Sequence, residues 1–282
     1  MTLARMSPLI VDDAVARALK EDFGDAGDIT TNATIPAEAM ARAAIVARRS
    51  GVIAGVDAAI AAFRMVDPSI TVSIERDDGA RVKKGDVILA ISGPARGVLS
   101  AERVALNFMG RLSGIATATA ALADAVACTN AKIACTRKTA PGLRAFEKHA
   151  VRCGGGHNHR FGLYDAVMIK DNHIAAAGGI AKALAAARTA TGHMVKIEIE
   201  VDAIAQLEEA LAHGADVVLL DNMTPADLKR AVALNQGRAV LEASGNVTID
   251  TVRAIAETGV DVISSGAITH SAPNLDLGLD FL

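Results

Sequence analysis

Cationic and imidazole side chains gather in one part of this sequence. Arg137 and Lys138 follow an apolar run, His159 and Arg160 follow three glycines, and Lys170 ends the next apolar run. An Arg side chain offers a planar fork to a carboxylate or phosphate, and a Lys side chain offers a point charge. An Arg-Lys pair alone would most simply be two solvated surface charges. The whole cluster between Arg137 and Lys170 is instead suited to binding a small, highly anionic substrate.

The segment between these cations contains Gly154-Gly155-Gly156, then His157 and His159. Consecutive glycines lose much backbone entropy on folding, so we expect them where the backbone approaches a ligand or bends unusually. The two His residues could bind a metal, but no third ligand is spaced for it, which favours a hydrogen-bonding and cationic role. Lys170 has three possible roles: a phosphate contact, a Schiff base, or a structural ion pair.

Acidic residues come at corresponding positions farther along the chain. In VKIEIEVD the charged residues Lys196, Glu198 and Glu200 alternate with apolar ones, so they share one face of a strand. Asp221 ends the following apolar run. Glu200 and Asp221 could hold Mg²⁺ or ribose hydroxyls, or could be charge partners for the cations of the cluster.

Two small-residue turns follow the last two apolar runs. Such turns leave backbone N–H groups available to a phosphate, and the last two loops of an α/β barrel often form a phosphate site. The candidate phosphate-binding residues are Ser244, Gly245, Asn246, Ser265, Gly266 and Ala267.

The elements that must position these side chains repeat along the second half of the chain. Six short apolar runs end in polar residues, and helical stretches such as 203–215 and 248–260 lie between the later ones. The runs span 132–139, 165–172, 195–202, 215–222, 238–246 and 260–267. This rhythm indicates β-α units with a parallel sheet, either open or closed into a barrel of fewer than eight strands. The chemistry of both architectures lies at the carboxyl ends of the strands.

The first half of the chain has a different pattern. We expect a helix over 8–21, an irregular segment over 21–36, short strands and turns over 41–92, and a long helix over 100–127. Ser113-Gly114 within the long helix suggests a kink or a domain boundary. Residues 72–92 resemble half of a biotinyl or lipoyl carrier, but no lysine stands in the required hairpin tip, so a small β-rich subdomain is the better interpretation.

The bulk composition excludes several classes of protein. The 282 residues carry a net charge of −3, one Tyr and no Trp, which does not favour binding to nucleic acid or an anionic membrane. Three cysteines without metal-ligand spacing argue against disulfides and zinc. Without a signal peptide or a long uncharged apolar stretch, the chain is expected to be cytoplasmic.

The run TRKTAPGLRAFEKHAVRCGGGHNHRFGLYDAVMIKDNHI (136–174) resembles the signature region of the quinolinate phosphoribosyltransferase family. The similarity extends to EDFGDAGDITT, SAERVALNFMGRLSGIAT, LLDNM, EASGNVT and SSGAITHSAPNLDLGLDF. It implies an α/β class: an N-terminal α/β sandwich over 1–113, with the tail 271–282 returning to it, and an incomplete, about six-stranded α/β barrel over 114–270. It also implies quinolinate and phosphoribosyl pyrophosphate as substrates, nicotinate mononucleotide, CO₂ and pyrophosphate as products, Mg²⁺ as cofactor, and a homodimer.

The resemblance also assigns roles to single residues. It implies that Arg137, His159 and Arg160 grip the quinolinate carboxylates, joined by Arg103 from the other subunit. Lys138 and Lys170 would lie near both substrates. Glu200 and Asp221 would be the ribose- and Mg²⁺-associated acids. The two small-residue turns would bind the 5′-phosphate, and His157 receives no role.

Two rival functions remain at this point. One is a paralogous phosphoribosyltransferase-like protein linked to molybdenum transport, against which the complete set of carboxylate-binding residues argues. The other is a Schiff-base lyase that uses Lys170.

Overall fold

The computed structural model describes residues 3–282, which form two compact units. The N-terminal unit comprises residues up to 120 together with 139–155 and 268–282, and the barrel unit comprises 121–138 and 156–267. The predicted boundary lay at 113/114 and assigned all of 114–270 to the barrel. The structure instead groups 139–155 with the N-terminal unit, because this segment packs on that unit's long helix.

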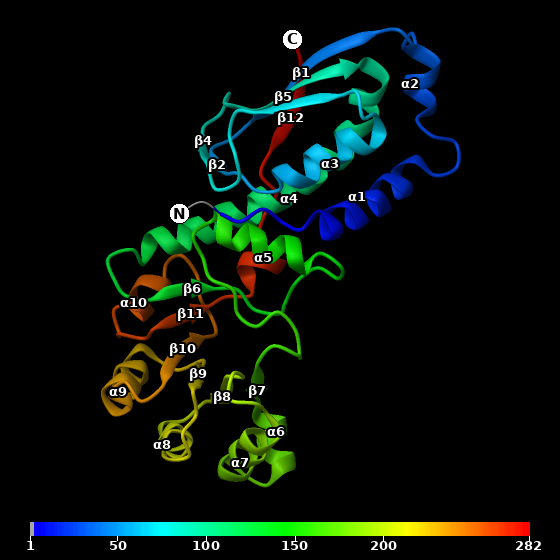
Figure 1. The fold of residues 1–282 in the computed structure, drawn as a ribbon. Coiled ribbons are helices and arrows are strands. Elements are labelled where there is room, and N and C mark those ends of the chain that lie inside the picture. The colour runs from blue at the N-terminus through cyan, green and yellow to red at the C-terminus, as the bar shows by residue number, and fades with distance from the viewer. Residues whose placement is uncertain (1–2) are drawn as a thin grey trace. The chain divides into compact units, whose positions relative to one another are not determined.

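The N-terminal unit combines helices with a four-stranded sheet of order β12-β1-β5-β3 (Figure 1). Its helices are α1 (Pro8–Phe23), α2 (Ile29–Thr34), α3 (Val56–Val66), α4 (Ala95–Ala125), α5 (Arg144–Cys153) and α11 (Ala267–His270). Its strands are β1 (Met40–Ala47), β2 (Gly51–Val52), β3 (Thr71–Ile74), β4 (Arg81–Val82), β5 (Val87–Pro94) and β12 (Leu277–Phe281). The last turn of α4 and the first residue of α11 count with the barrel unit.

Two helices of this unit differ from the sequence prediction. α2 lies in the segment expected to be irregular, where the Asp28 side chain caps it by accepting the backbone N–H of Thr31 at 2.9 Å. α3 lies in the segment expected to hold only strands and turns. Its alanines favour a helix, and Val56, Ala59 and Phe63 are buried at helical spacing.

The C-terminal strand β12 lies antiparallel to β1, with Ala43 opposite Phe281 and Ala47 opposite Leu277. The Arg48 guanidinium clamps this strand, with Nη1 2.9 Å from Oδ2 of Asp280. The same bond lowers the pKa of Asp280. The end of the chain is therefore a strand of the N-terminal sheet.

Gly114 has a packing role rather than marking a kink. α4 runs continuously through Ser113-Gly114. A Cβ on Gly114 would overlap the carbonyl oxygen of Pro273, so only glycine lets the returning tail approach the helix backbone this closely.

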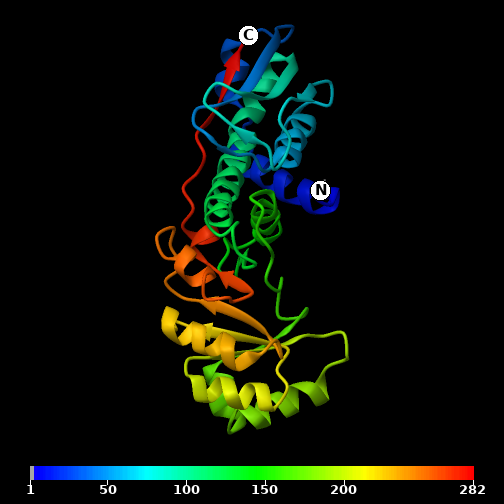
Figure 2. The ribbon, with the colours of Figure 1, turned by 90° about the vertical axis from the view of Figure 1, so that its left-hand side faces the viewer.

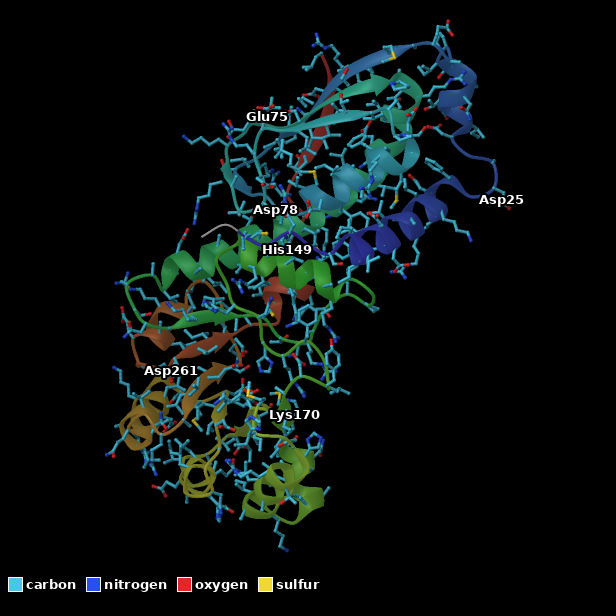
Figure 3. All side chains as sticks on the ribbon, viewed as in Figure 1. Asp25, Glu75, Asp78, His149, Lys170 and Asp261 are labelled. Carbon is cyan, nitrogen blue, oxygen red and sulfur yellow. The ribbon has the colours of Figure 1, made fainter. Side chains whose placement is uncertain are left out.

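Buried charged groups of the N-terminal unit are paired. Glu147 of α5 is fully buried and accepts hydrogen bonds from Nη2 and Nε of Arg111, at 2.8 and 3.2 Å. His149 Nε2 lies 2.7 Å from Oδ2 of Asp78, and Figure 3 labels both residues. Burial and the nearby Asp78 charge raise the pKa of Cys153, which keeps this thiol protonated. All three cysteines are free, as the sequence predicts.

The barrel unit is built on a parallel sheet of six strands, in the order β6-β11-β10-β9-β8-β7. The strands are β6 (Lys132–Ala134), β7 (Val167–Ile169), β8 (Ile197–Val201), β9 (Val217–Asp221), β10 (Val240–Ser244) and β11 (Val262–Ser264). All six coincide with the six predicted runs. Because β6 and β7 remain edge strands, the barrel is incomplete, which confirms the predicted fold class.

Helices cover the outside of these strands in both views (Figures 1 and 2). They are α6 (Asp171–Ala177), α7 (Ile180–Ala190), α8 (Ile204–Ala212), α9 (Pro225–Asn235) and α10 (Val252–Ala256). Among residues 3–282, no helix is both long and apolar enough to cross a membrane.

The glycine segment leads into the edge of this sheet. A Cβ on Gly154 would overlap the carbonyl oxygen of Ala116 on α4, and Gly155 has a φ of +82°. These two glycines therefore serve close helix packing and a left-handed turn, which corresponds to the expected unusual bend. His157 then forms a parallel bridge with Ala134 of β6. The segment 156–166 thus leaves one edge strand of the incomplete barrel and enters the other.

Candidate active site

The carboxyl ends of the barrel strands are aligned by their register. Ser244 of β10 lies opposite Asp221 of β9 and Ser264 of β11, and Ser264 lies opposite Ala134 of β6. Residues that follow these positions therefore emerge at the same end of the sheet. This alignment brings together side chains that are more than 100 positions apart in the chain.

Two guanidinium groups lie close together at this end. Burial lowers the pKa of Arg160, and the nearby positive charge of Arg137 lowers it further. Nη1 of Arg160 donates to the carbonyl oxygen of Ala166 at 3.1 Å. The Nε atoms of Arg137 and Arg160 are both buried and have no hydrogen-bond partner among the described residues. Two neighbouring cations with unused donors form a site that an anion would complete.

A rigid loop follows Arg160. The Asp165 carboxylate accepts the backbone N–H groups of Phe161 and Gly162, at 2.6 and 2.8 Å. The loop presents Leu163 and Tyr164, whose relative exposures are 75% and 82%. Two large apolar side chains are thus held in solvent beside the cationic site.

Lys170 forms an ion pair with Glu200 on the neighbouring strand, which is the structural alternative the sequence left open. Glu198 and Glu200 lie on the same face of β8, as the alternation predicts. Lys196 differs from that prediction, because it precedes β8, is exposed and lies 3.5 Å from Asp216. Lys138 is also exposed, and its backbone N–H donates to Oγ1 of Thr136 at 3.0 Å.

His159 stands between the cationic pair and two buried carboxylates. Its Nε2 lies 2.9 Å from Oε2 of Glu198 and 3.8 Å from Oε1 of Glu242. Glu198 and Glu242 are only 6% and 5% exposed. Burial and the charge of Glu198 raise the pKa of Glu242 to about 7, against an opposing effect of His159. Glu242 therefore holds its proton into the neutral range.

The backbone is left-handed at three positions after β9 and β10. Asn222, Gly245 and Asn246 have φ angles of 54°, 100° and 51°. The Asn222 side chain donates to Oδ2 of Asp221 at 2.8 Å, and it occupies the space that a Cβ on Gly245 would need. Non-glycine residues in this conformation cluster at functional sites, because the surrounding structure must hold them there.

The two predicted phosphate turns differ in the backbone groups that they offer. Gly245 and Asn246 form consecutive left-handed positions at the end of β10. The backbone N–H of Ser265, by contrast, already donates to the carbonyl oxygen of Ala134 at 3.0 Å, so it is not available to a phosphate. At the second turn, the Ser265 hydroxyl remains as a candidate phosphate contact, next to Gly266 and Ala267.

Arg103 belongs to the N-terminal unit rather than the barrel. It lies on the exposed face of α4, and within residues 3–282 no hydrogen bond or ion pair engages its side chain. Its neighbours Val104, Ala105 and Leu106 are buried. An exposed, unpaired Arg on a largely buried helix is available to another molecule.

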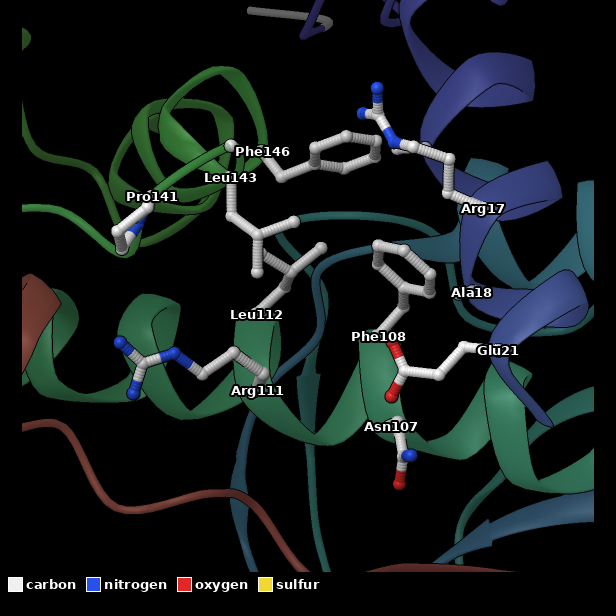
Figure 4. Close-up of a pocket in the computed structure, with 12 residues that line it drawn as sticks. Arg17, Ala18, Glu21, Asn107, Phe108, Arg111, Leu112, Pro141, Leu143 and Phe146 are labelled. Atoms are coloured by element: carbon white, nitrogen blue, oxygen red, sulfur yellow. The ribbon is translucent and has the colours of Figure 1, made fainter.

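The N-terminal unit also contains a cavity of about 420 Å³ between α1, α4 and the segment 139–155 (Figure 4). The rings of Phe108 and Phe146 face it, with centroids 5.4 Å apart. Its walls are mainly apolar, with Arg17 and Glu21 on α1. None of the predicted site residues lines this cavity, so it is separate from the candidate site.

Glu242 was not among the residues predicted for the site, and Glu198 was predicted only to share a face of its strand with Glu200. The signal for Glu242 was the single charge in the run VLEAS, where an ion inside an apolar strand needs a reason. Asn222 was also missed, because a positive φ has no signature in one Asp-Asn pair.

Family profiles cover nearly the whole chain. The profile of the quinolinate phosphoribosyl transferase N-terminal domain matches residues 28–113, and that of the C-terminal domain matches 115–280. A probable nicotinate-nucleotide pyrophosphorylase [carboxylating] of Bacillus subtilis (strain 168) is 47% identical over 263 residues, covering 92% of this chain and 89% of the relative. The corresponding protein of Mycobacterium leprae (strain TN) is 46% identical, with coverages of 95% and 96%.

Solved structures agree with the profiles. The nicotinate-nucleotide pyrophosphorylase of Francisella tularensis superposes with a TM-score of 0.95 at 39% identity, covering 100% of this chain and 99% of that one. NadC of Streptococcus pyogenes gives 0.94 at 42% identity, with 99% of each chain covered. With both domain profiles in sequence order and relatives of nearly the same length, this chain belongs to the quinolinate phosphoribosyltransferase family.

Proposed function

We propose that this protein transfers the phosphoribosyl group of phosphoribosyl pyrophosphate to the ring nitrogen of quinolinate, with loss of CO₂. The products are nicotinate mononucleotide, CO₂ and pyrophosphate, as in the synthesis of NAD. The observation that carries the proposal is the pair of buried, unpartnered guanidinium nitrogens of Arg137 and Arg160. Quinolinate is a small dianion whose two carboxylates match two neighbouring guanidinium groups.

The cationic pair binds and orients quinolinate. In the absence of substrate, burial lowers the pKa of Arg160, and repulsion by the like charge of Arg137 lowers it further. A bound carboxylate relieves that repulsion and fixes the ring nitrogen in register with the ribose. Lys138 and Lys170 add positive charge for the second substrate, phosphoribosyl pyrophosphate.

The opposite side of the site holds the ribose and phosphates. Glu200 and Asp221 accept hydrogen bonds from the ribose hydroxyls, and nearby carboxylates stabilise the positive charge that develops at ribose C1. The left-handed turn at Gly245 and Asn246, with Ser244 and the turn Ser265-Gly266-Ala267, binds the 5′-phosphate. The Asn222 side chain holds the Asp221 carboxylate in place.

Glu200 and Asp221 also fit a magnesium ion. Both provide carboxylate oxygens, the ligands that Mg²⁺ prefers, from neighbouring strands. When bound with substrate phosphates, Mg²⁺ neutralises charge on the pyrophosphate leaving group. Lys170 forms an ion pair with Glu200. We therefore expect its ammonium group to contact the same leaving group.

We further propose that the enzyme works as a homodimer in the cytoplasm. Arg103 is exposed and unpaired in the part of the chain that the structure describes, which suits a residue that completes the partner's site. Leu163 and Tyr164, exposed beside Arg160, provide apolar surface for a contact with the second copy. Three free cysteines suit a reducing compartment.

The product assay tests the proposed reaction. Purified protein with quinolinate, phosphoribosyl pyrophosphate and Mg²⁺ should form nicotinate mononucleotide and release CO₂ and pyrophosphate. No product from a well-folded protein would refute the proposal. Lys170 adduct formation after borohydride treatment with substrate would instead support the Schiff-base lyase, and inactivity with quinolinate would favour the molybdenum-linked relative.

Subunit mixing tests the shared site. Arg103→Ala and Lys138→Ala proteins should each be inactive alone. Mixed after subunit exchange, they should recover up to about a quarter of the wild-type activity per site, because some hybrid dimers keep one intact site. No recovery after confirmed exchange would show that Arg103 does not complete the partner's site.

A further inference from the structure

The barrel holds a buried cluster that the reaction scheme above does not use. Glu198 of β8 and Glu242 of β10 are each more than nine-tenths buried, and each keeps an Oε1 atom without a hydrogen-bond partner among the described residues. The ion pairs found for these two carboxylates are both to His159. Burying two carboxylates against one imidazole is costly, so the arrangement calls for a functional reason.

The contacts of His159 define its tautomer. The backbone N–H of Arg160 donates to Nδ1 at 2.8 Å, so Nδ1 carries no proton. The proton of the neutral ring is then on Nε2, which lies 2.9 Å from Oε2 of Glu198 and donates to it. Both ring nitrogens of His159 are thus engaged within the protein.

This tautomer disfavours a metal ion in the cluster. Nε2, Glu198 and Glu242 lie close enough together to surround a cation. A metal on Nε2 would require the proton to move to Nδ1, where it would face the N–H of Arg160, another donor. A proton rather than a metal is therefore the compatible occupant, consistent with the neutral Glu242 carboxyl.

We propose that Glu198, backed by Glu242, is a positioning residue that acts through His159 to fix the main chain at Arg160 and so aim its guanidinium group at the substrate carboxylate. Rigid side chains behind a binding residue reduce the entropy lost on binding. The proposal rests on the proposed function, because it assigns Arg160 to quinolinate. His159 would then support Arg160 in addition to the contact with quinolinate that the resemblance implies for it.

Kinetics of matched variants separate positioning from general stability. Glu198→Ala should raise the KM for quinolinate at least about tenfold, since a hydrogen bond to a charged acceptor is lost, with the KM for phosphoribosyl pyrophosphate changed less than about twofold. Glu198→Gln should retain a quinolinate KM within about threefold of wild type, because its amide oxygen still accepts from Nε2. Glu257→Gln, at an exposed carboxylate of the same unit, is the control. Equal increases in both KM values, or no increase, would overturn the proposal.

Nitrogen NMR of histidine-labelled protein gives a readout that needs no turnover. The His159 resonances, identified by their loss in His159→Asn, should show an unprotonated Nδ1 and a protonated Nε2 in wild type and in Glu198→Gln. In Glu198→Ala the bias toward this tautomer should fall. A protonated Nδ1 in the wild-type protein would overturn the inference even if every variant failed to fold.

A metal titration tests the alternative that His159, Glu198 and Glu242 bind a metal ion. Zn²⁺, which is diamagnetic, added to the full-length protein without substrate should leave Nδ1 of His159 unprotonated and Nε2 protonated. One equivalent of tightly bound metal that is lost in Glu242→Gln would overturn the proposal in favour of a metal site. If the wild-type protein makes no nicotinate mononucleotide, the proposed function fails, whereas the tautomer and metal measurements still test the cluster itself.

Discussion

The two units treat buried charge in opposite ways. In the N-terminal unit, Glu147 is fully buried but receives two hydrogen bonds from Arg111. In the barrel unit, the buried side-chain atoms without a partner are Arg137 Nε, Arg160 Nε, Glu198 Oε1, Glu242 Oε1 and Ser264 Oγ. All five such atoms found among residues 3–282 belong to the barrel unit. Paired charge stabilises a fold, whereas an unpaired buried charge is a cost that a bound ligand or a proton can remove.

The largest effect expected from this contrast is on activity. Arg137→Ala should lower kcat/KM for quinolinate about a thousandfold, roughly 4 kcal/mol, because the substrate loses a buried charged contact. The free energy of unfolding should stay the same or rise, since a repulsive neighbour of Arg160 is removed. Steady-state kinetics and urea denaturation measure the two effects. Arg253→Ala, at an exposed ion pair, should change neither; a marked loss of stability in Arg137→Ala would make it a structural residue like Arg111.

The next effect belongs to the paired unit. Glu147→Ala leaves the Arg111 guanidinium without its buried partner and should cost about 3 kcal/mol of stability or more. Urea denaturation checks this value. Glu257→Ala, whose partner Arg253 is exposed, should cost less than about 1 kcal/mol. Equal losses in the two variants would remove the distinction between buried and exposed pairs.

The buried carboxyl group of Glu242 should make the free energy of unfolding depend on pH. Its pKa in the folded protein is about 7, above the ordinary value of 4.5, so the folded state binds more protons between these two pH values. Stability should therefore fall as pH rises from about 4.5 to about 7, by an amount on the order of 2–3 kcal/mol. Glu242→Gln should remove this slope and be more stable than wild type at pH 8. Denaturation at several pH values tests it, and an unchanged slope would mean that another group titrates there.

The smallest effect concerns packing. Gly114→Ala would favour the helical state of α4 but places a methyl group against the carbonyl of Pro273. We expect a net loss of roughly 1–2 kcal/mol. Gly192→Ala, with open space around it, is the control for the thermal melts. A stabilised Gly114→Ala protein would show that the segment around Pro273 can move away from α4 at little cost.

Much of the barrel could be predicted from the sequence alone. Each of the six strands lies within a short apolar run that ends in polar residues. Such a run is typical of a strand that is buried on both faces. The rule that strand ends meet at one edge then grouped Arg137, Lys170, Glu200 and Asp221 correctly on the barrel unit. The N-terminal unit was harder, because the alanine-rich helix α3 has little contrast between its faces.

Only the tertiary structure decided which charges are paired. The sequence placed a glutamate in VLEAS and another in EKHA without distinguishing them. Sheet order set Glu242 near Glu198 and His159, whereas packing of α5 on α4 gave Glu147 its arginine. Local patterns fix the elements because periodicity is a property of neighbouring residues. Ion-pair partners 36 to 83 positions apart depend on how those elements assemble, and that assembly decides which buried charges gain a full set of hydrogen bonds.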